Sequence, residues 1–98
     1  MIDQSKWIKL TLAQQLGNIG SEISRARHWQ EKKDASSARE ALERAIGLLD
    51  QTLNDARHRR RLRELARLRE VVCDWYSERG EYNCPPQTLE EYCLALSL

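Results

Sequence analysis

Apolar residues recur at intervals of three and four along three long stretches of this chain, and no segment alternates apolar and polar residues with period two. The first spacing places apolar side chains on one face of an α-helix, whereas the second would indicate a half-buried strand. The pattern predicts helices over about Lys9–Glu31, Ala35–Leu53 and Arg57–Glu78. Short connections favour antiparallel neighbours. We therefore expect an all-α fold: an up-down helical bundle of three long helices plus a short C-terminal helix, forming a single domain over residues 1–98.

Capping patterns predict where the second helix begins. Ser37 followed three residues later by Glu40 is the pattern of a capping box, in which the two side chains satisfy backbone amides at a helix start. Asp34 and Ser36 are alternative caps. The second helix is therefore expected to start within this short polar segment.

Similar patterns predict the C-terminal boundaries. Gly80 is suited to the position just after a helix end, where a left-handed backbone is common. The segment 81–87 contains two consecutive prolines and is expected to be a loop. Thr88 followed by Glu91 is a second capping box, which predicts that the short fourth helix opens there.

The composition excludes several classes of protein. The 98 residues are 41% hydrophobic and 32% charged, with a net charge of +1, which suits a thin helical bundle and leaves no overall field to attract nucleic acid or an anionic membrane. No apolar run is long enough to span a bilayer, and the first twelve residues do not resemble a signal peptide. We expect a cytoplasmic, bacterial protein that does not bind membranes.

Neither a metal, a cofactor nor a catalytic activity is expected. The cysteines, Cys73, Cys84 and Cys93, are odd in number and no pair has Cys-x-x-Cys spacing, so a disulfide framework or zinc site is not indicated. Phosphate-binding, hydrolase and metalloprotease motifs are absent. His28 and His58 are predicted to lie on the polar sides of their helices, as ordinary surface residues.

A run of arginines opens the third expected helix, with seven arginines within thirteen residues. Two interpretations remain open. On an ideal helix Arg60 can pair with Glu64 and Arg67 with Glu70, which indicates a salt-bridged, solvated surface. Alternatively, the run contacts nucleic acid. Because cations at a helix start oppose the helix dipole, a nearby acid such as Asp55 is expected to compensate. The candidate nucleic-acid contacts are Arg57, Arg59, Arg60, Arg63 and Arg67.

Arg69 differs from the rest of the run because the helical spacing places it within the apolar sector. A buried guanidinium needs a carboxylate partner. Glu22 is the favoured partner, because it borders the apolar stripe of the first helix, and Asp50 is the next candidate. The pair is expected to set the register between helices.

A polar row on the first helix is the best candidate interaction site. Asn18, Glu22, Arg25 and Trp29 are spaced by four, three and four residues, which places them on one side of that helix. Tryptophan and arginine are common interface anchors, so the row predicts a contact with a polar ligand or a partner helix. A rim of satisfied polar groups around the core is the alternative.

Two stretches resemble small bacterial all-helical proteins of unassigned function: Leu16–Trp29, which contains Gly17-Asn18-Ile19-Gly20-Ser21-Glu22, and Arg61–Glu70. In broad shape the chain is also similar to HEPN domains and to the helical bundles encoded in ribosomal RNA intervening sequences. The HEPN resemblance implies an RNase or a partner in a toxin–antitoxin pair. Arg25 precedes His28 too closely for the HEPN nuclease motif, so no catalytic residue is carried over.

These observations together predict a non-enzymatic helical interaction module. We expect self-association, as a homodimer or with another protein partner, because the apolar sector of the third helix is wide: Leu68 and Trp75 lie on one edge and Cys73 on the other. The alternative is a nucleic-acid-binding protein, with RNA as the ligand, or a toxin–antitoxin accessory protein. Both alternatives use the arginine-rich start of the third helix.

Overall fold

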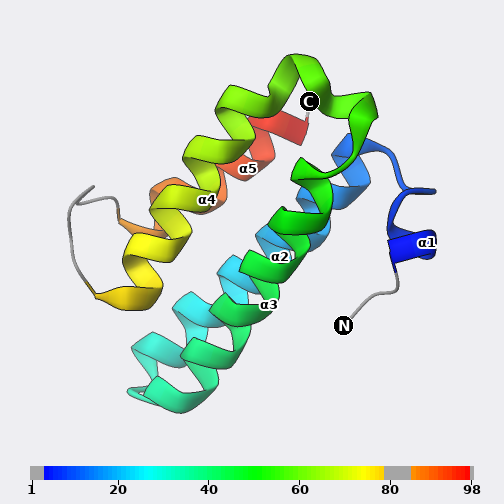
Figure 1. Ribbon diagram of the computed structural model, residues 1–98. Coiled ribbons are helices and arrows are strands. Elements are labelled where there is room, and N and C mark those ends of the chain that lie inside the picture. Colours follow the sequence, from blue (N-terminus) through cyan, green and yellow to red (C-terminus); the bar gives the residue numbers. More distant parts are fainter. Residues whose placement is uncertain (1–3, 79–84, 98) are drawn as a thin grey trace.

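The computed structural model describes residues 4–78 and 85–97, and every regular element within these ranges is a helix (Figure 1). The prediction of an all-α fold is therefore confirmed. No helix of the described ranges is long and apolar enough to cross a lipid bilayer. The elements in chain order are α1 (Gln4–Trp7), α2 (Leu12–Glu31), α3 (Ala35–Leu53), the 3₁₀-helix η1 (Ala56–Arg61), α4 (Leu62–Ser77) and α5 (Pro86–Ser97).

Helix α2 lies at the centre of the arrangement. It packs most extensively against α3 and α5, and α3 in turn packs against α4. A three-residue turn joins α2 to α3, and the two helices lie side by side and antiparallel (Figure 1). The start of α2 and the end of α3 therefore lie at the same end of the molecule. This brings α1 and η1 close together although they are about fifty residues apart in sequence.

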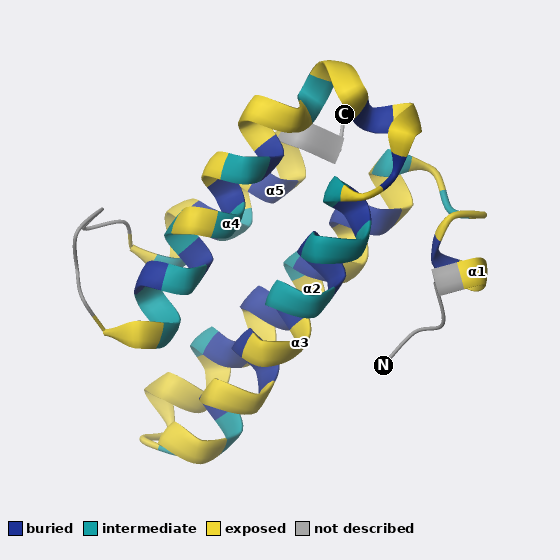
Figure 2. Ribbon diagram, viewed as in Figure 1, coloured by how far each residue is buried: buried dark blue, intermediate teal, exposed yellow. Residues whose placement is uncertain are grey.

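One apolar cluster fills the interior and draws on every α-helix (Figure 2). Most apolar residues at helical spacing in the three long stretches belong to this cluster, as the pattern predicts. Leu62, at the start of the third stretch, is an exception and is 40% exposed. Trp7 of α1 and Cys93 of α5 are also buried members of the cluster. Its members with at most 1% exposure from α2, α3 and α4 are Leu16, Ile19, Ile23, Ala26, Ala41, Ala45, Leu49, Leu65, Leu68 and Val72.

Helix α2 begins at Leu12, so the predicted start at Lys9 was wrong. Thr11 and Gln14 form a capping box: the Thr11 hydroxyl accepts from the Gln14 amide at 3.1 Å, and the Gln14 side chain accepts from the Thr11 amide at 2.9 Å. This reciprocal cap fixes the start of α2, because it satisfies backbone amides that have no partner within the helix. The residues before it form the separate short helix α1.

Helix α3 has the predicted limits but not the predicted capping box. Asp34 is the N-cap, and its carboxylate accepts hydrogen bonds from both the amide and the hydroxyl of Ser37, at 3.1 and 2.8 Å. Ser37 is thus the partner of the cap rather than the cap itself. The alternative cap Asp34 was the correct one.

The third predicted helix is not continuous, which corrects its predicted start at Arg57. Asp55 caps a 3₁₀-helix, the backbone leaves helical geometry at His58 (φ −101°, ψ 20°), and the α-helix begins only at Leu62. Clustered cations at a helix start oppose its dipole, and the contacts made by the buried Asp55 and His58 side chains hold the bend. At its other end α4 stops at Ser77, and the following residue, Glu78, caps it with a left-handed backbone of φ 59°. Gly80, the predicted end residue, lies outside the described residues.

Helix α5 begins earlier than predicted, at Pro86 rather than just after a Thr88 cap. The Pro85 carbonyl accepts from the amides of Thr88 and Leu89 at 3.0 and 3.3 Å. Proline suits the first position of a helix because its backbone nitrogen needs no partner there. The capping box predicted from Thr88 and Glu91 was therefore wrong. Most of the predicted 81–87 loop lies outside the described residues.

Candidate functional site

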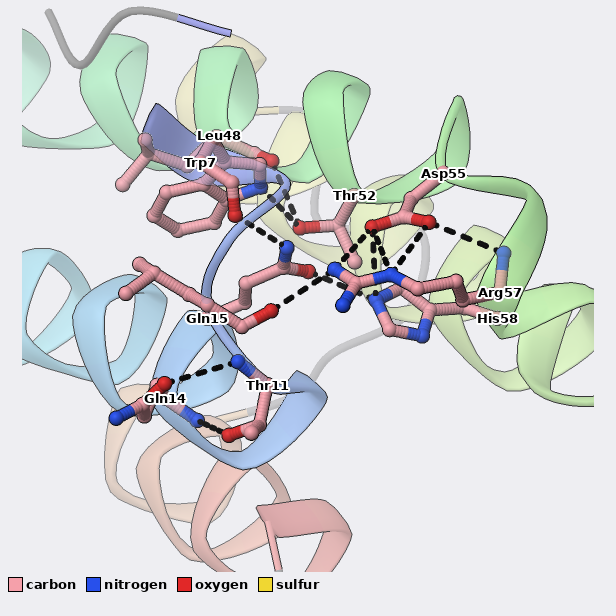
Figure 3. Close-up of polar contacts among 10 residues, drawn as sticks. Trp7, Thr11, Gln14, Gln15, Leu48, Thr52, Asp55, Arg57 and His58 are labelled. Carbon is pink, nitrogen blue, oxygen red and sulfur yellow. Dashed lines mark hydrogen bonds and ion pairs between the residues drawn. The ribbon is translucent and has the colours of Figure 1, made fainter. Parts of the chain in front are cut away.

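The N-terminal segment is attached to the bundle by Trp7 (Figure 3). Its ring is fully buried, and its Nε1 donates to the hydroxyl of Thr52 at 3.0 Å. That hydroxyl in turn donates to the Leu48 carbonyl at 3.0 Å within α3. A buried indole N–H needs such an acceptor. The short helix α1 is thereby fixed against the last turn of α3.

Gln15 connects this segment to η1. Its side-chain nitrogen donates to the Trp7 carbonyl at 2.9 Å, which leaves its side-chain oxygen as an acceptor. Nε2 of His58 lies 3.0 Å from that oxygen, so Nε2 carries the proton of the imidazole. Both Gln15 and His58 are buried. The prediction that His58 is a surface residue was wrong, because the bend in η1 turns its ring into the interior.

Asp55 and Arg57 form the strongest ion pair of this region. The Arg57 Nη2 lies 2.6 Å from the carboxylate, and the same nitrogen donates to the Leu10 carbonyl at 2.8 Å. The carboxylate is 5% exposed and also accepts from the Arg57 amide at 3.0 Å. Asp55 therefore compensates Arg57, the first arginine of the run, as expected, but not the other arginines. Arg57 thus joins η1 to the N-terminal segment.

The protonation states of this cluster follow from its contacts. Hydrogen bonds from Arg57 lower the pKa of Asp55 to about 2, although burial opposes the charge. Burial lowers the pKa of His58, and the neighbouring Asp55 carboxylate, 3.4 Å from Nε2, only partly offsets this. The cluster therefore contains one balanced ion pair and a neutral imidazole near pH 7.

Above this buried cluster lies an exposed basic surface, which we call the arginine corner and define as η1 and the first two residues of α4 (residues 56–63). Arg59, Arg60 and Arg63 are exposed. None of the three pairs with a carboxylate in the part of the chain that the structure describes. The two acids beside them are already engaged, Asp55 by Arg57 and Glu64 by Arg61.

The bend in η1 explains why the predicted pairing failed. Arg60 was expected to meet Glu64, four residues later on a continuous helix. The Glu64 carboxylate instead accepts from Arg61 Nε at 3.0 Å, because α4 begins only at Leu62. Arg67, the last candidate of the run, is exposed on α4 beyond the arginine corner.

Two lysines of the N-terminal segment, Lys6 and Lys9, lie at the same end of the molecule as the arginine corner and are exposed. The Arg57 contact to the Leu10 carbonyl joins the two segments. The sequence gives no signal for these lysines, and Trp7 lies in a segment that carries no periodic pattern. A signal existed for Gln15, because a polar residue four positions before Ile19 falls in register with the apolar stripe.

The polar row of α2 does not form one site. Glu22 is buried and pairs with Arg25 on its own helix and with Arg44 of α3, whose Nε lies 2.7 Å from the carboxylate. Asn18 is exposed and donates to the Gln14 carbonyl one turn earlier, and the partly exposed Trp29 ring contacts His28 edge-on. Glu22 is therefore a link between helices α2 and α3.

Arg69 pairs with Asp50, not with the favoured Glu22. The Arg69 Nε lies 2.5 Å from the Asp50 carboxylate, joining α4 to α3 as expected. Its side chain is 38% exposed, so the prediction of a buried guanidinium was wrong. The pair lies at the edge of the α3–α4 interface.

Chemistry at the cysteines is limited. Cys93 is buried, and burial raises the pKa of its thiol to about 12, so little nucleophilic thiolate forms near neutral pH. Cys73 is half-buried beside the Arg69 guanidinium. Cys84 lies outside the described residues. No cluster of metal-ligating side chains occurs within residues 4–78 and 85–97.

A cavity of about 430 Å³ lies at the end of the molecule opposite the arginine corner. It is lined by the end of α2, the start of α3, the end of α4 and the first residues of α5. Arg39 stacks over the Tyr76 ring at its wall, 5.0 Å from the ring centroid.

Comparison with known proteins found no matching family model, no matching curated protein and no matching solved structure.

Proposed function

We propose that this chain is a non-enzymatic interaction module that binds nucleic acid through the arginine corner. The observation that carries the proposal is the set of three exposed arginines, Arg59, Arg60 and Arg63, without carboxylate partners among the described residues. A guanidinium matches the geometry of a phosphate and forms two parallel hydrogen bonds with it. A polyanion would relieve the repulsion among these neighbouring cations.

The buried cluster beneath the corner supports the same function. The contacts of Asp55 and His58 fix the bend of η1, so the arginines project from a backbone that is already ordered. Binding then costs less conformational entropy than it would on a mobile loop. The net charge of +1 is compatible with nucleic-acid binding, because the phosphates would contact the local positive charge of the arginine corner.

The test compares two variants that lose the same charge at opposite ends of the molecule. The first carries Arg59→Gln, Arg60→Gln and Arg63→Gln. The control carries Lys32→Gln, Lys33→Asn and Arg39→Gln, at or near the other end of α3, a helix about 28 Å long. Asparagine is chosen at Lys33 because the backbone φ there is 61°.

Binding of labelled RNA and DNA is measured by fluorescence anisotropy at several salt concentrations. We expect the arginine variant to bind at least about tenfold more weakly and its salt dependence to fall by about one unit of slope per arginine. The control should bind like the parent. Absence of binding at low salt, or an equal loss of affinity in both variants, refutes the proposal. Binding of polyglutamate with the same affinity as nucleic acid also contradicts it, because the corner would then bind any polyanion.

Self-association is a second candidate, favoured by apolar side chains of α5. Leu94 is 71% exposed and Tyr92 is 36% exposed. The wide apolar sector of α4 gives weaker support for self-association, because Leu68 is 1% exposed in a single copy. Light scattering tests this candidate: a dimer mass that Leu94→Gln converts to a monomer supports it, and a monomer mass for the parent refutes it.

We also propose the up-down bundle as the description of the fold, with α2, α3 and α4 as the long helices and α5 as the short one. The antiparallel α2–α3 pair supports it. Cross-linking between cysteines placed on neighbouring helices tests the order.

A further inference from the structure

The aromatic side chains at the arginine corner are buried. Trp7 has no exposed surface and His58 is 6% exposed. The exposed rings are His28 and Trp29 near the end of α2 and Tyr92 on α5, among the described residues. Proteins that bind single strands stack the bases on exposed aromatic rings along a basic groove. Within the described residues of the corner, the exposed side chains are cations and aliphatic groups such as Leu62, and none is an aromatic ring.

The cations of this end come from two separate segments. Lys6 and Lys9 belong to the N-terminal segment, whereas the arginines belong to η1 and α4, and Arg57 joins the segments through the Leu10 carbonyl. The cations at this end are therefore not confined to one helix. The cavity of about 430 Å³ lies at the opposite end, so it is not a channel for a strand held at the corner.

From these two observations we infer that the ligand is double-helical nucleic acid, held by its phosphate backbone with the lysines of the N-terminal segment taking part. This inference rests on the proposed function. A duplex carries the denser line of charge, and each phosphate contact releases more counterion from it than from a single strand. A surface that contacts only phosphates therefore favours the duplex, and it does so without reading the base sequence.

The experiment uses the full chain with a labelled duplex and its separated single strands at equal phosphate concentration, over a salt series. We expect the duplex to bind at least about tenfold more tightly at low salt, with a slope of about −3 to −4.5. Lys6→Gln with Lys9→Gln should reduce that slope by about two. Lys32→Gln with Lys33→Asn is the matched control and should leave it unchanged.

The outcomes separate this inference from the proposed function. Single strands that bind as tightly as the duplex overturn the duplex inference while nucleic-acid binding stands. An unchanged slope in the Lys6/Lys9 variant overturns the role of the N-terminal segment. No binding of any nucleic acid overturns the proposed function itself. Equal affinity for duplexes of unrelated sequence supports backbone recognition, and strong sequence preference contradicts it.

Discussion

The indole Nε1 of Trp7 donates to the hydroxyl of Thr52 across 3.0 Å, and both side chains are completely buried. The two residues are 45 positions apart, so this contact exists only in the folded bundle. It attaches the N-terminal segment to the end of α3, next to the arginine corner. The buried cluster of Trp7, Gln15, Thr52, Asp55 and His58 is thus the base on which the exposed basic surface rests.

Removing the Thr52 hydroxyl should destabilise the fold more than its small size suggests. Thr52→Val preserves shape but leaves the Trp7 N–H buried without an acceptor, at a cost of about 1–3 kcal/mol. Trp7→Phe removes the donor instead. In the double variant the losses should be less than additive, because no donor is left unsatisfied. Chemical denaturation of the four proteins measures this, and strictly additive losses would contradict the coupling.

Asp55→Ala should lower the free energy of unfolding by about 1–2 kcal/mol, because Asp55 caps η1 and neutralises Arg57. Asp34→Ala is the matched control, since Asp34 caps α3 through the Ser37 amide in a more exposed setting. We expect the control to lose less. Equal losses in thermal and urea unfolding would show that burial of Asp55 adds nothing beyond the cap.

Acidification should weaken the fold through His58. Its pKa is lowered by burial in the folded protein, whereas the unfolded chain binds a proton near the ordinary value of 6.5. Below that pH the unfolded state binds more protons, so stability is full above it and falls as the pH decreases through 6.5 toward the folded pKa.

The check is urea unfolding between about pH 7.5 and 5.5. His58→Gln keeps a donor for the Gln15 oxygen but does not titrate, so its stability should change less with pH than that of the parent. The Asp55 carboxyl loses its contribution in a separate window, from 3.8 down to about 2. Identical pH profiles for the two proteins would rule out His58 as the sensitive group.

The two ion pairs between helices should differ in their contribution to stability. Arg69 and Asp50 are 38% and 49% exposed, so Asp50→Asn should cost less than about 1 kcal/mol. Glu22 is 9% exposed and holds Arg25 and Arg44, so Glu22→Gln should cost about 1–3 kcal/mol. Denaturation at low and high salt compares them. A larger loss at Asp50 would reverse the ranking by burial.

Gly17→Ala should stabilise the protein by about 1 kcal/mol. Gly17 lies inside α2, and a Cβ there would meet nothing within 4 Å, so the change adds helix propensity without a clash. Gly20→Ala should also be favourable, because its Cβ would lie 3.6 Å from that of Cys93, an ordinary contact. A loss of stability at Gly17 would indicate that another molecule occupies that face in solution.

Much of the architecture could be predicted because it depends on local spacing. The stripe through Leu16, Ile19 and Ile23 and the limits of α3 were predicted correctly, since a period of 3.6 residues determines which face of a helix is apolar. Capping was less predictable. Several polar residues near a helix start can accept the same amides, and only the backbone direction selected Asp34 over Ser37.

The candidate site could be predicted only in part. The sequence indicated the arginine run and its partner Asp55, but a helical wheel assumed a continuous helix through His58. The bend placed Arg61 rather than Arg60 beside Glu64 and turned His58 inward. The sequence also could not reveal that Arg69 pairs with Asp50 rather than Glu22, because that choice depends on how α3 and α4 cross.

By itself, then, the spacing of apolar residues determined that this chain is helical and which faces are buried, because those properties repeat along a single helix. The contacts between distant segments were decided by packing. Trp7 on Thr52 and Gln15 on His58 form because the antiparallel α2–α3 pair brings residues about 45 positions apart to one end. No periodic pattern encodes such pairs, since each joins one polar atom to another across the fold.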